Sequence, residues 1–397
     1  MIVGRNYLMD CMNDNKYKIV YCTPSLYMAG GVERVLTLKA NYFADVYGYD
    51  ITIVTTDGEN KENYFPLSSK VKVVNLCIHF DEMWHHSFLK RLSLYLPKER
   101  LFKKKLTEEL NRIKPDITIS LLRREINFLT DIQDGSKKIG EIHINRAHYR
   151  NFTPNRTNPF KALFAKYWMY GLVKKIKKLD RFVVLTEYDR QAWEDIPRVD
   201  VIPNPLPFYP EINDKSRRKR LIAVGRYFDE KGYDMLLRAW AIVEKECKEW
   251  ELDIYGDGNK TYYEKLSSSL GLDKRRFRLN GSVSNVQDEY LDSSVFVCTS
   301  RFEGFGMGII EAMACGLPVV AFDCLWGPRS IISNGEDGVL VENGNVEKFA
   351  EAILSLINNP EKLLMMSNNA HKNVWRFNIE GIALKWKKLF DEVVDES

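Results

Sequence analysis

The stretch Glu303–Glu311 reads "EGFGMGIIE" and lies between the apolar runs "VFVCTS" and "AMACGLPVVA". This order predicts a buried strand, a glycine-rich turn and then a helix. Gly304, Gly306 and Gly308 allow the backbone to approach a ligand closely. The first N–H groups of a helix are free to bind an anion. The stretch therefore predicts an α/β fold with a diphosphate site at the start of this helix.

The two carboxylates that frame the stretch suit a different part of a ligand. Phosphates would repel Glu303 and Glu311, which lie up to about 12 Å apart if the segment is helical. That separation suits hydroxyl groups on either side of a diphosphate, with a sugar ring near Glu303 and a ribose near Glu311. The alternative is a glycine turn with two solvated acids.

Short apolar runs alternate with amphipathic helical patterns along the whole chain. In the first half the predicted buried parallel strands are Lys18–Thr23, Asp50–Thr55, Val71–Leu76, Asp116–Leu121 and Arg181–Leu185. In the second half they are Arg220–Val224, Glu251–Tyr255, Phe277–Leu279, Val295–Cys298 and Pro318–Ala321. Helical patterns lie between them, for example in 232–246 and 346–358. This alternation predicts two doubly wound, Rossmann-like α/β domains.

The proline-rich segment "IPNPLPFYP" at 202–210 marks the join, because it can neither complete a helix nor enter a central strand. We predict a first domain over residues 1–205 and a second over 206–375. A last helix, about 376–397, is expected to pack back onto the first domain. Ligands of doubly wound sheets bind beyond the carboxyl ends of the strands, so the motifs should gather there.

Two cations follow a predicted strand in "VGRYFDEKG", residues 224–232. Arginine can grip a phosphate with two hydrogen bonds, and lysine can act as a point charge. Arg226 and Lys231 are thus candidates for binding a diphosphate. The alternative is a pair of solvated loop cations.

Two weaker candidates lie in the first half. The pair Gly30 and Gly31 opens a predicted helix in "AGGVERV", which favours contact with a phosphate, although a tight strand-to-helix turn explains it equally well. His143, in "EIHINRAH", has the chemistry to bind a sugar hydroxyl or to move a proton. A lone histidine is more often structural.

Charge is spread unevenly between the halves. Residues 1–200 carry 33 Lys and Arg against 24 Asp and Glu, whereas residues 201–397 carry 25 against 30. Basic stretches at 98–105 and 160–181 account for part of this excess, and the second interleaves lysines with aromatic residues. Such a helix suits an anionic membrane surface, or else packs on its own sheet with a solvated lysine face. Without a recognition motif, nucleic acid is not an expected partner.

The start of the chain is polar, and no apolar run reaches the roughly 20 residues that cross a bilayer. Seven cysteines without CxxC spacing indicate reduced, mostly buried thiols. We therefore expect a cytoplasmic protein, with peripheral contact with the inner membrane as the alternative to a fully soluble one.

Several blocks of the sequence resemble those of a known enzyme family. "EGFGMGIIEAMACGLPVVAFD" resembles the E-x7-E signature of the large retaining family-4 glycosyltransferases. "VGRYFDEKGYDMLLRAW", "IYGDGN", "VIPNP" and "GGVERV" resemble that family's other blocks. The segment 323–341 resembles a C-x2-GP-x2-II pattern of members that build bacterial surface polysaccharides from UDP-sugars. The resemblance implies a GT-B architecture, with two Rossmann-like domains facing across a cleft.

The resemblance also implies residue roles. The implied catalytic residues are Glu303, Arg226, Lys231 and His143, although His143 is followed here by Ile-Asn rather than by the Ser-Arg of many members. The implied donor-binding residues are Gly30, Gly31, Gly304, Phe305, Gly306, Met307, Gly308 and Glu311. The cations would neutralise the leaving diphosphate, Glu303 would hold donor-sugar hydroxyls, and Glu311 would bind the ribose.

The implied reaction is transfer of a hexose or N-acetylhexosamine from a nucleotide diphosphate, with a UDP-sugar favoured, to a glycan acceptor, which we expect to be lipid-linked. It serves capsule, O-antigen or exopolysaccharide synthesis, with retention of configuration. No Asp-x-Asp pair occurs, so we expect neither a metal nor another cofactor. The alternatives are a nucleotide-sugar epimerase or a phosphorylase of the same architecture, and a non-catalytic nucleotide-sugar-binding subunit.

Overall fold

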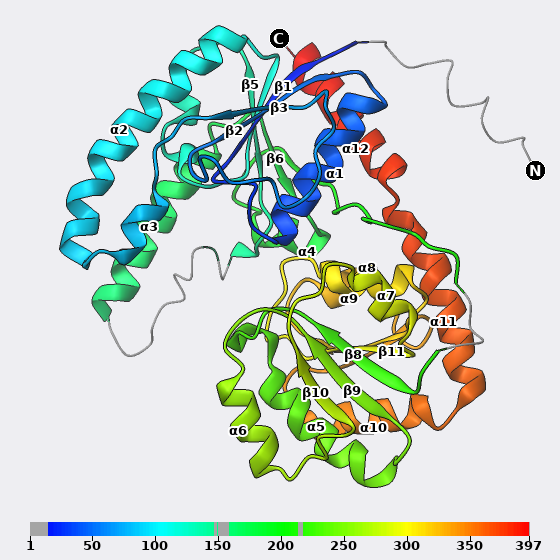
Figure 1. Ribbon diagram of the computed structural model, residues 1–397. Helices are drawn as coiled ribbons and strands as arrows, with labels where there is room; N and C mark the ends of the chain where they lie inside the picture. The colour runs from blue at the N-terminus through cyan, green and yellow to red at the C-terminus, as the bar shows by residue number, and fades with distance from the viewer. Residues whose placement is uncertain (1–14, 147–148, 150–158, 213–216, 397) are drawn as a thin grey trace, which may run out of the picture. The chain divides into compact units, whose positions relative to one another are not determined.

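The computed structural model describes residues 15–146, 149, 159–212 and 217–396. It contains two all-parallel sheets whose strands alternate with helices along the chain (Figure 1). The predicted α/β class with two Rossmann-like sheets is confirmed.

The first sheet has seven strands in the order β3-β2-β1-β4-β5-β6-β7. Their bounds are β1 Lys18–Thr23, β2 Asp50–Thr55, β3 Lys72–Asn75, β4 Ile117–Ser120, β5 Lys137–Glu141, β6 Arg181–Val184 and β7 Val199–Val201. Strand β1 lies in the middle and pairs in register with β2 and β4, as with Ile19 opposite both Ile51 and Ile117. The chain order reverses at β1, so the carboxyl end of β1 is a topological switch point.

Helices cover both faces of the first sheet because successive side chains of a buried strand point to opposite faces. Val20 and Cys22 of β1 belong to a core cluster with Leu106 of α2 (Phe88–Ile113). Helix α12 (Ile379–Asp395) joins α1 (Gly31–Asp45) through the edge-to-face ring contact of Phe43 with Phe390, whose centroids lie 5.6 Å apart. Figure 1 shows the red end of the chain beside the blue start.

A buried ion pair lies among α1, β5 and α12. Nζ of Lys39 is 2.6 Å from Oε2 of Glu141, and each side chain is 1% exposed. The ammonium also lies 4.3 Å from the centroid of the Trp386 ring. Burial lowers the pKa of Lys39, and the Glu141 carboxylate opposes that effect. The Glu141 carboxylate thus offsets the cost of burying this ammonium beneath helix α12.

The second sheet has six strands in the order β10-β9-β8-β11-β12-β13. Their bounds are β8 Arg220–Val224, β9 Glu251–Tyr255, β10 Phe277–Asn280, β11 Val295–Cys298, β12 Val319–Asp323 and β13 Gly338–Glu342. Two core clusters cover it. One includes Trp240 of α5 (Tyr233–Glu246) and Phe349 of α10 (Val346–Ile357), and the other includes Ile310 of α8 (Met307–Ala314) and Ala370 of α11 (Pro360–Val374).

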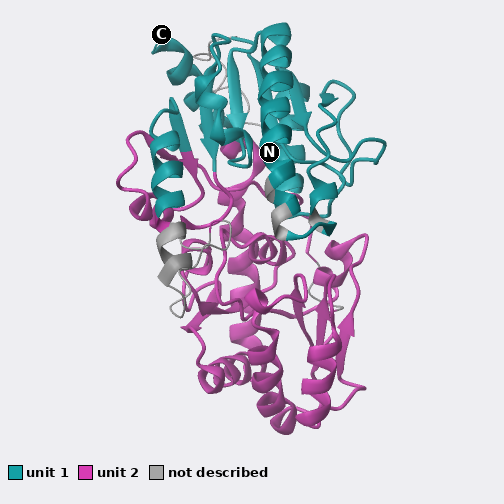
Figure 2. Ribbon diagram, turned by 90° about the vertical axis from the view of Figure 1, so that its left-hand side faces the viewer, with its two compact units in different colours: residues 1–141, 167–182, 383–397 teal, residues 142–166, 183–382 magenta. Residues whose placement is uncertain are grey.

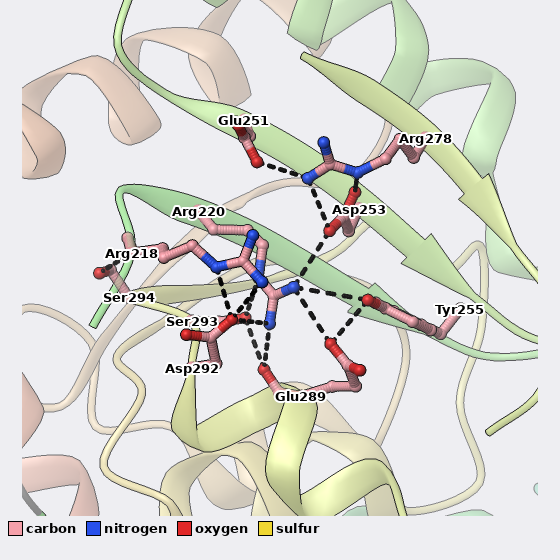
Figure 3. Close-up of polar contacts among 10 residues, drawn as sticks. All are labelled: Arg218, Arg220, Glu251, Asp253, Tyr255, Arg278, Glu289, Asp292, Ser293 and Ser294. Atoms are coloured by element: carbon pink, nitrogen blue, oxygen red, sulfur yellow. Dashed lines mark hydrogen bonds and ion pairs between the residues drawn. The ribbon is translucent and has the colours of Figure 1, made fainter. Parts of the chain in front are cut away.

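An ionic network lies at the amino-terminal end of β8 (Figure 3). The Arg220 side chain is 1% exposed, and its guanidinium lies 3.1 Å from Oδ2 of Asp253 and 3.1 Å from Oε2 of Glu289. It also donates to Oγ of Ser293 at 2.9 Å. Arg278 of β10 donates to the other carboxylate oxygen of Asp253 at 2.7 Å. Arg220 therefore links β8 and β9 to the segment that precedes β11.

The remaining helices are shorter or less regular. They are α3 Pro159–Ile176, α4 Glu187–Ala192, α6 Thr261–Ser269, α7 Val286–Leu291 and α9 Pro328–Ile331, with 3₁₀ turns η1 Asp81–His85, η2 Glu125–Asn127, η3 Leu129–Asp131, η6 Asp229–Lys231 and η7 Trp375–Phe377. Among the described residues, none of the helices combines the length and the apolar character needed to cross a membrane.

Contacts divide the chain into two compact units (Figure 2). Residues 1–141, 167–182 and 383–397 form the first unit, and residues 142–166 and 183–382 form the second. The last part of α12 groups with the first unit. The domain boundary between residues 205 and 206 stays a prediction, since it falls between the two sheets but inside the second unit.

Most predicted strands agree with the structure to within two residues, and the exceptions lie toward sheet edges. The prediction that Val71–Leu76 is a buried strand is wrong, because β3 pairs only with β2 at the edge and its Lys72 and Val73 are exposed. No bounds were predicted for β5, and strands β7 and β13 were not predicted. Asp200 interrupts the apolar pattern of β7, and a turn-rich "SNGED" precedes β13.

Six described cysteines are free thiols, and Cys11 lies outside the described residues. Four of them are buried, namely Cys22, Cys298, Cys315 and Cys324. Burial raises the pKa of Cys315 to about 12, so this thiol stays protonated and unreactive. The prediction of mostly buried thiols is confirmed for the described cysteines, of which Cys77 and Cys247 are partly buried.

Candidate active site

The glycine-rich stretch forms a turn that delivers helix α8. Gly306 precedes the helix with φ 108° and ψ 55°, a left-handed conformation that favours glycine. Helix α8 begins at Met307, within the glycine-rich stretch where a helix start was predicted. By helix geometry the N–H groups of Met307 and Gly308 have no carbonyl partner within the helix. This end of α8 has the character of an anion site.

The structure brings Lys231 and Glu303 together at this turn. Nζ of Lys231 lies 2.6 Å from Oε1 of Glu303, and Oγ of Ser300 donates to the same oxygen at 2.6 Å. The two side chains are 23% and 14% exposed. Both hydrogen bonds that the described residues make to this carboxylate go to Oε1, leaving Oε2 for a hydroxyl group.

Close packing directs Lys231 to this position. It ends η6 and precedes Gly232, which has φ 61°, and its carbonyl accepts a hydrogen bond from Oγ1 of Thr299. A methyl group on Gly225 would lie 2.9 Å from Cε of Lys231, so the glycine makes room for the lysine stem.

The ion pair sets the charge of Lys231. Burial alone would lower its pKa, but the Glu303 carboxylate and neighbouring acidic groups raise the pKa above its ordinary value. Lys231 is therefore an ammonium ion at neutral pH, as a group that stabilises a departing diphosphate must be.

Arg226 does not join this pair in the structure. Its side chain is 62% exposed and lies 3.3 Å from Oε1 of Glu230, with the guanidinium carbon 4.6 Å from the centroid of the Phe228 ring. Its long stem leaves it free to reorient, so binding a phosphate would require exchange of Glu230 for the ligand.

Three other donor-site candidates lie along or beside α8. Glu311 is 6% exposed and accepts from the Tyr290 hydroxyl at 3.4 Å. Phe305 is 4% exposed as a whole residue and its ring packs edge-to-face on Phe377, so its side chain is part of the core. Gly308 packs close to Phe296, where a methyl group would lie 3.3 Å from Cζ.

His143 follows β5 and belongs to the second unit together with Gly304. A methyl group on Gly304 would lie 2.4 Å from the His143 carbonyl oxygen, so only glycine fits there. The structure thus places the backbone of His143 beside the glycine turn.

Gly30 and Gly31 lie at the start of α1, at the carboxyl end of β1 in the first unit. The Glu33 carboxylate lies against Gly30 at this helix start, because a methyl group on Gly30 would lie only 1.9 Å from Oε2 of Glu33. A phosphate that bound here would have to displace this carboxylate, because like charges repel. The structure therefore gives the Gly30–Gly31 pair less support as a diphosphate site than α8.

Two site residues were not predicted from the sequence. Ser300 donates a hydrogen bond to Glu303. Its position three residues before the glutamate was the sequence signal that could have indicated this contact. Trp326 pairs with Glu303 in an isolated parallel bridge, has φ 76° and donates from Nε1 to the carbonyl of Tyr188 at 3.2 Å. Its position next to Gly327 gave no indication of this contact.

The chain is similar to proteins of known families and to solved structures. Residues 208–373 match the model of the family described as glycosyl transferases group 1. This range contains β8, α8 and the Lys231–Glu303 pair. An uncharacterized glycosyltransferase of Haemophilus influenzae is 29% identical over 377 residues, which cover 93% of this chain and 99% of the relative.

A second relative and a solved structure extend the comparison. The amylovoran biosynthesis glycosyltransferase AmsD of Erwinia amylovora is 26% identical and covers 94% of this chain and 100% of its own. A structure of S. aureus TarM with fondaparinux, α-GlcNAc-glycerol and UDP has a TM-score of 0.77 at 19% identity, covering 94% of this chain and 100% of that one. The match over residues 208–373 and these two relatives support glycosyltransferase activity for the chain, and its fold is similar to that of GT-B structures such as TarM.

Proposed function

We propose that this glycosyltransferase moves a hexose or N-acetylhexosamine from a UDP-sugar to a glycan acceptor in the synthesis of a bacterial surface polysaccharide. Two similar proteins support the proposal: the relative AmsD is named for amylovoran biosynthesis, and the TarM structure contains UDP and α-GlcNAc-glycerol. The observation that carries it is the Lys231–Glu303 pair beside the start of α8.

The chemistry follows from where charge develops. As the anomeric carbon becomes cationic, the departing diphosphate becomes more anionic. Lys231, Arg226 and the free N–H groups of α8 are the groups that would stabilise this leaving group without a metal. Oε2 of Glu303 would hold a donor-sugar hydroxyl, and Glu311 would hold the ribose. We propose retention of configuration by a same-face substitution that the departing phosphate assists.

A donor panel tests this proposal. The purified protein is incubated with UDP-, GDP-, ADP- and dTDP-sugars in EDTA, with and without lipid-linked oligosaccharide, and nucleoside diphosphate release is measured. We expect release from a UDP-sugar that EDTA does not change and that falls at least about 100-fold in Glu303→Gln. Glu342→Gln, which changes an exposed glutamate, is the matched control.

Other outcomes would contradict the proposal. Interconversion of two UDP-sugars without UDP release would identify an epimerase. Stabilisation by UDP without turnover of any donor would identify a binding subunit, and loss of release in EDTA would overturn the metal-free mechanism.

The stereochemistry needs a test of its own. An α-linked product from an α-linked donor, identified by NMR, would establish retention.

The acceptor proposal includes peripheral contact with an anionic membrane from the cytoplasmic side, through α3. Tyr167 and Tyr170 are 76% and 69% exposed, and Lys166 and Lys174 are exposed beside them. Two other lysines of the predicted basic face have protein partners, since Lys175 donates to Asn127 and Lys178 pairs with Asp131. The side chains of residues 159–165 lie outside the described part.

We expect the protein to sediment with phosphatidylglycerol vesicles and to lose about 30-fold in partitioning when Lys166 and Lys174 are both changed to Gln. This estimate takes about 1 kcal/mol for each lysine near an anionic surface. The control is Lys265→Gln with Lys348→Gln, which removes two exposed lysines of the second unit. Equal loss in both double variants, or no sedimentation at low salt, would contradict the membrane proposal.

A further inference from the structure

A cysteine, a histidine and a glutamate gather at the carboxyl ends of β2 and β3 in the first unit. Glu59 follows β2, and Cys77 and His79 follow β3. One potential ligand atom of each residue lies within 4.8 Å of the others. Nε2 of His79 lies 3.3 Å from Oε2 of Glu59. The proposed transfer reaction uses none of these residues.

The three side chains offer a thiolate sulfur, an imidazole nitrogen and a carboxylate oxygen, which are the ligands that Zn²⁺ takes in proteins. Tetrahedral zinc with bonds of about 2.0–2.3 Å sets its ligand atoms roughly 3.3–3.8 Å apart. The His79–Glu59 distance already matches. The remaining approach of about 1 Å is within reach of side-chain rotation, because His79 and Glu59 are 34% and 48% exposed.

The backbone presents Cys77 and His79 in an unusual way. They have φ 50° and 56°, in the left-handed region that non-glycine residues rarely adopt. Between them Ile78 is 2% exposed, and the N–H groups of Ile78 and His79 both donate to the carbonyl of Thr56. The loop thus buries its middle residue and turns its two flanking side chains outward beside Glu59.

The nearby cations do not occupy the ligand atoms. Nζ of Lys98 donates to the carbonyls of Ile78 and His79, and Nζ of Lys105 donates to that of Leu76. A Zn²⁺ ion bound by one thiolate, one carboxylate and a neutral imidazole forms a site of zero net charge, one unit more positive than the thiol and carboxylate before binding. The thiol proton leaves to solvent as the zinc–sulfur bond forms.

We propose that Glu59, Cys77 and His79 bind a Zn²⁺ ion, with water as the fourth ligand. The metal ties the loop after β2 to the loop after β3 at the edge of the first sheet. This site is separate in sequence and in unit from Lys231 and Glu303, so it stands or falls independently of the metal-free transfer reaction.

Cobalt reports on this site, because Co²⁺ accepts the same ligands and its complexes are coloured. The full-length protein is stripped with a chelator, dialysed and titrated with Co²⁺ alone. We expect a thiolate-to-cobalt charge-transfer band and the visible bands of tetrahedral Co²⁺ at one equivalent, and their loss on adding Zn²⁺.

Variants assign the ligands. We expect Cys77→Ser to abolish the charge-transfer band. His79→Gln or Glu59→Gln should weaken Co²⁺ binding at least about tenfold, because mutating even a residue that only hydrogen-bonds to a metal ligand lowers metal affinity by that factor. Cys247→Ser changes the other partly buried thiol among the described cysteines and should leave the titration unchanged. Circular dichroism and UDP release check that each variant is folded.

Two results would overturn the proposal. One is the absence of a charge-transfer band in the wild type at saturating Co²⁺. The other is a band that survives in a folded Cys77→Ser variant, which would assign cobalt binding to another thiol.

Discussion

A Lys231→Met variant is expected to release UDP about 100- to 1,000-fold more slowly than the wild type, with most of the loss in kcat. Methionine keeps the length and apolar stem of lysine but removes the ammonium that lies 2.6 Å from Glu303. The leaving diphosphate then loses a cation where its charge develops. Steady-state kinetics of UDP release with the donor identified by the panel measure this effect.

The controls separate charge from structure. Lys348→Met removes an exposed lysine that pairs with Glu342, and we expect its kcat to equal that of the wild type. Lys231→Arg keeps the positive charge and should recover part of the lost rate. Thermal unfolding checks that the methionine variant is folded. A folded Lys231→Met enzyme with an unchanged kcat would remove Lys231 from the mechanism.

Arg220→Met is expected to reduce the free energy of unfolding of the second unit by about 3 kcal/mol. The substitution leaves Asp253, whose side chain is 2% exposed, without one of its two guanidinium partners (Figure 3). Breaking a buried ion pair costs about 3–5 kcal/mol. The lower end applies because Arg278 still bonds to Asp253.

Urea denaturation followed by hydrogen exchange of peptides from β8 and β9 measures this loss in the second unit itself. Arg218→Met is the matched control, because the Arg218 side chain is 57% exposed and pairs with Asp292 at the surface. Exposed pairs contribute about 1 kcal/mol or less. Equal losses for the two variants would show that burial of Arg220 has no special role in stability.

The sequence predicted the central strands well because their apolar runs report burial on both faces. Strands β1, β2, β8 and β9 have the predicted bounds. At the sheet edges the signal is unreliable. The apolar run 71–76 predicted a buried strand although β3 is partly exposed, and Asp200 interrupts the apolar pattern of β7, which was not predicted. A single parallel neighbour is enough to order a strand whose side chains remain exposed.

The candidate site was predicted by residue type but not by contact. Lys231 and Glu303 are 72 positions apart, and no spacing rule pairs them. Phe305 lies inside the glycine motif, yet its ring turns into the core against Phe377. Arg226, a predicted phosphate-binding residue, pairs with Glu230 in the structure. A local motif predicts the glycine turn, whereas the packing of segments distant in sequence determines which side chains face a ligand.

The grouping of residues 383–397 with the first unit has a consequence for synthesis on the ribosome. The Lys39–Glu141 pair is covered by Trp386, which is translated after every strand of both sheets. Domains usually fold in order as the chain emerges. Here the unit that emerges first must wait for the last helix to complete its core, so the second unit, through residue 382, can reach its native state before the first.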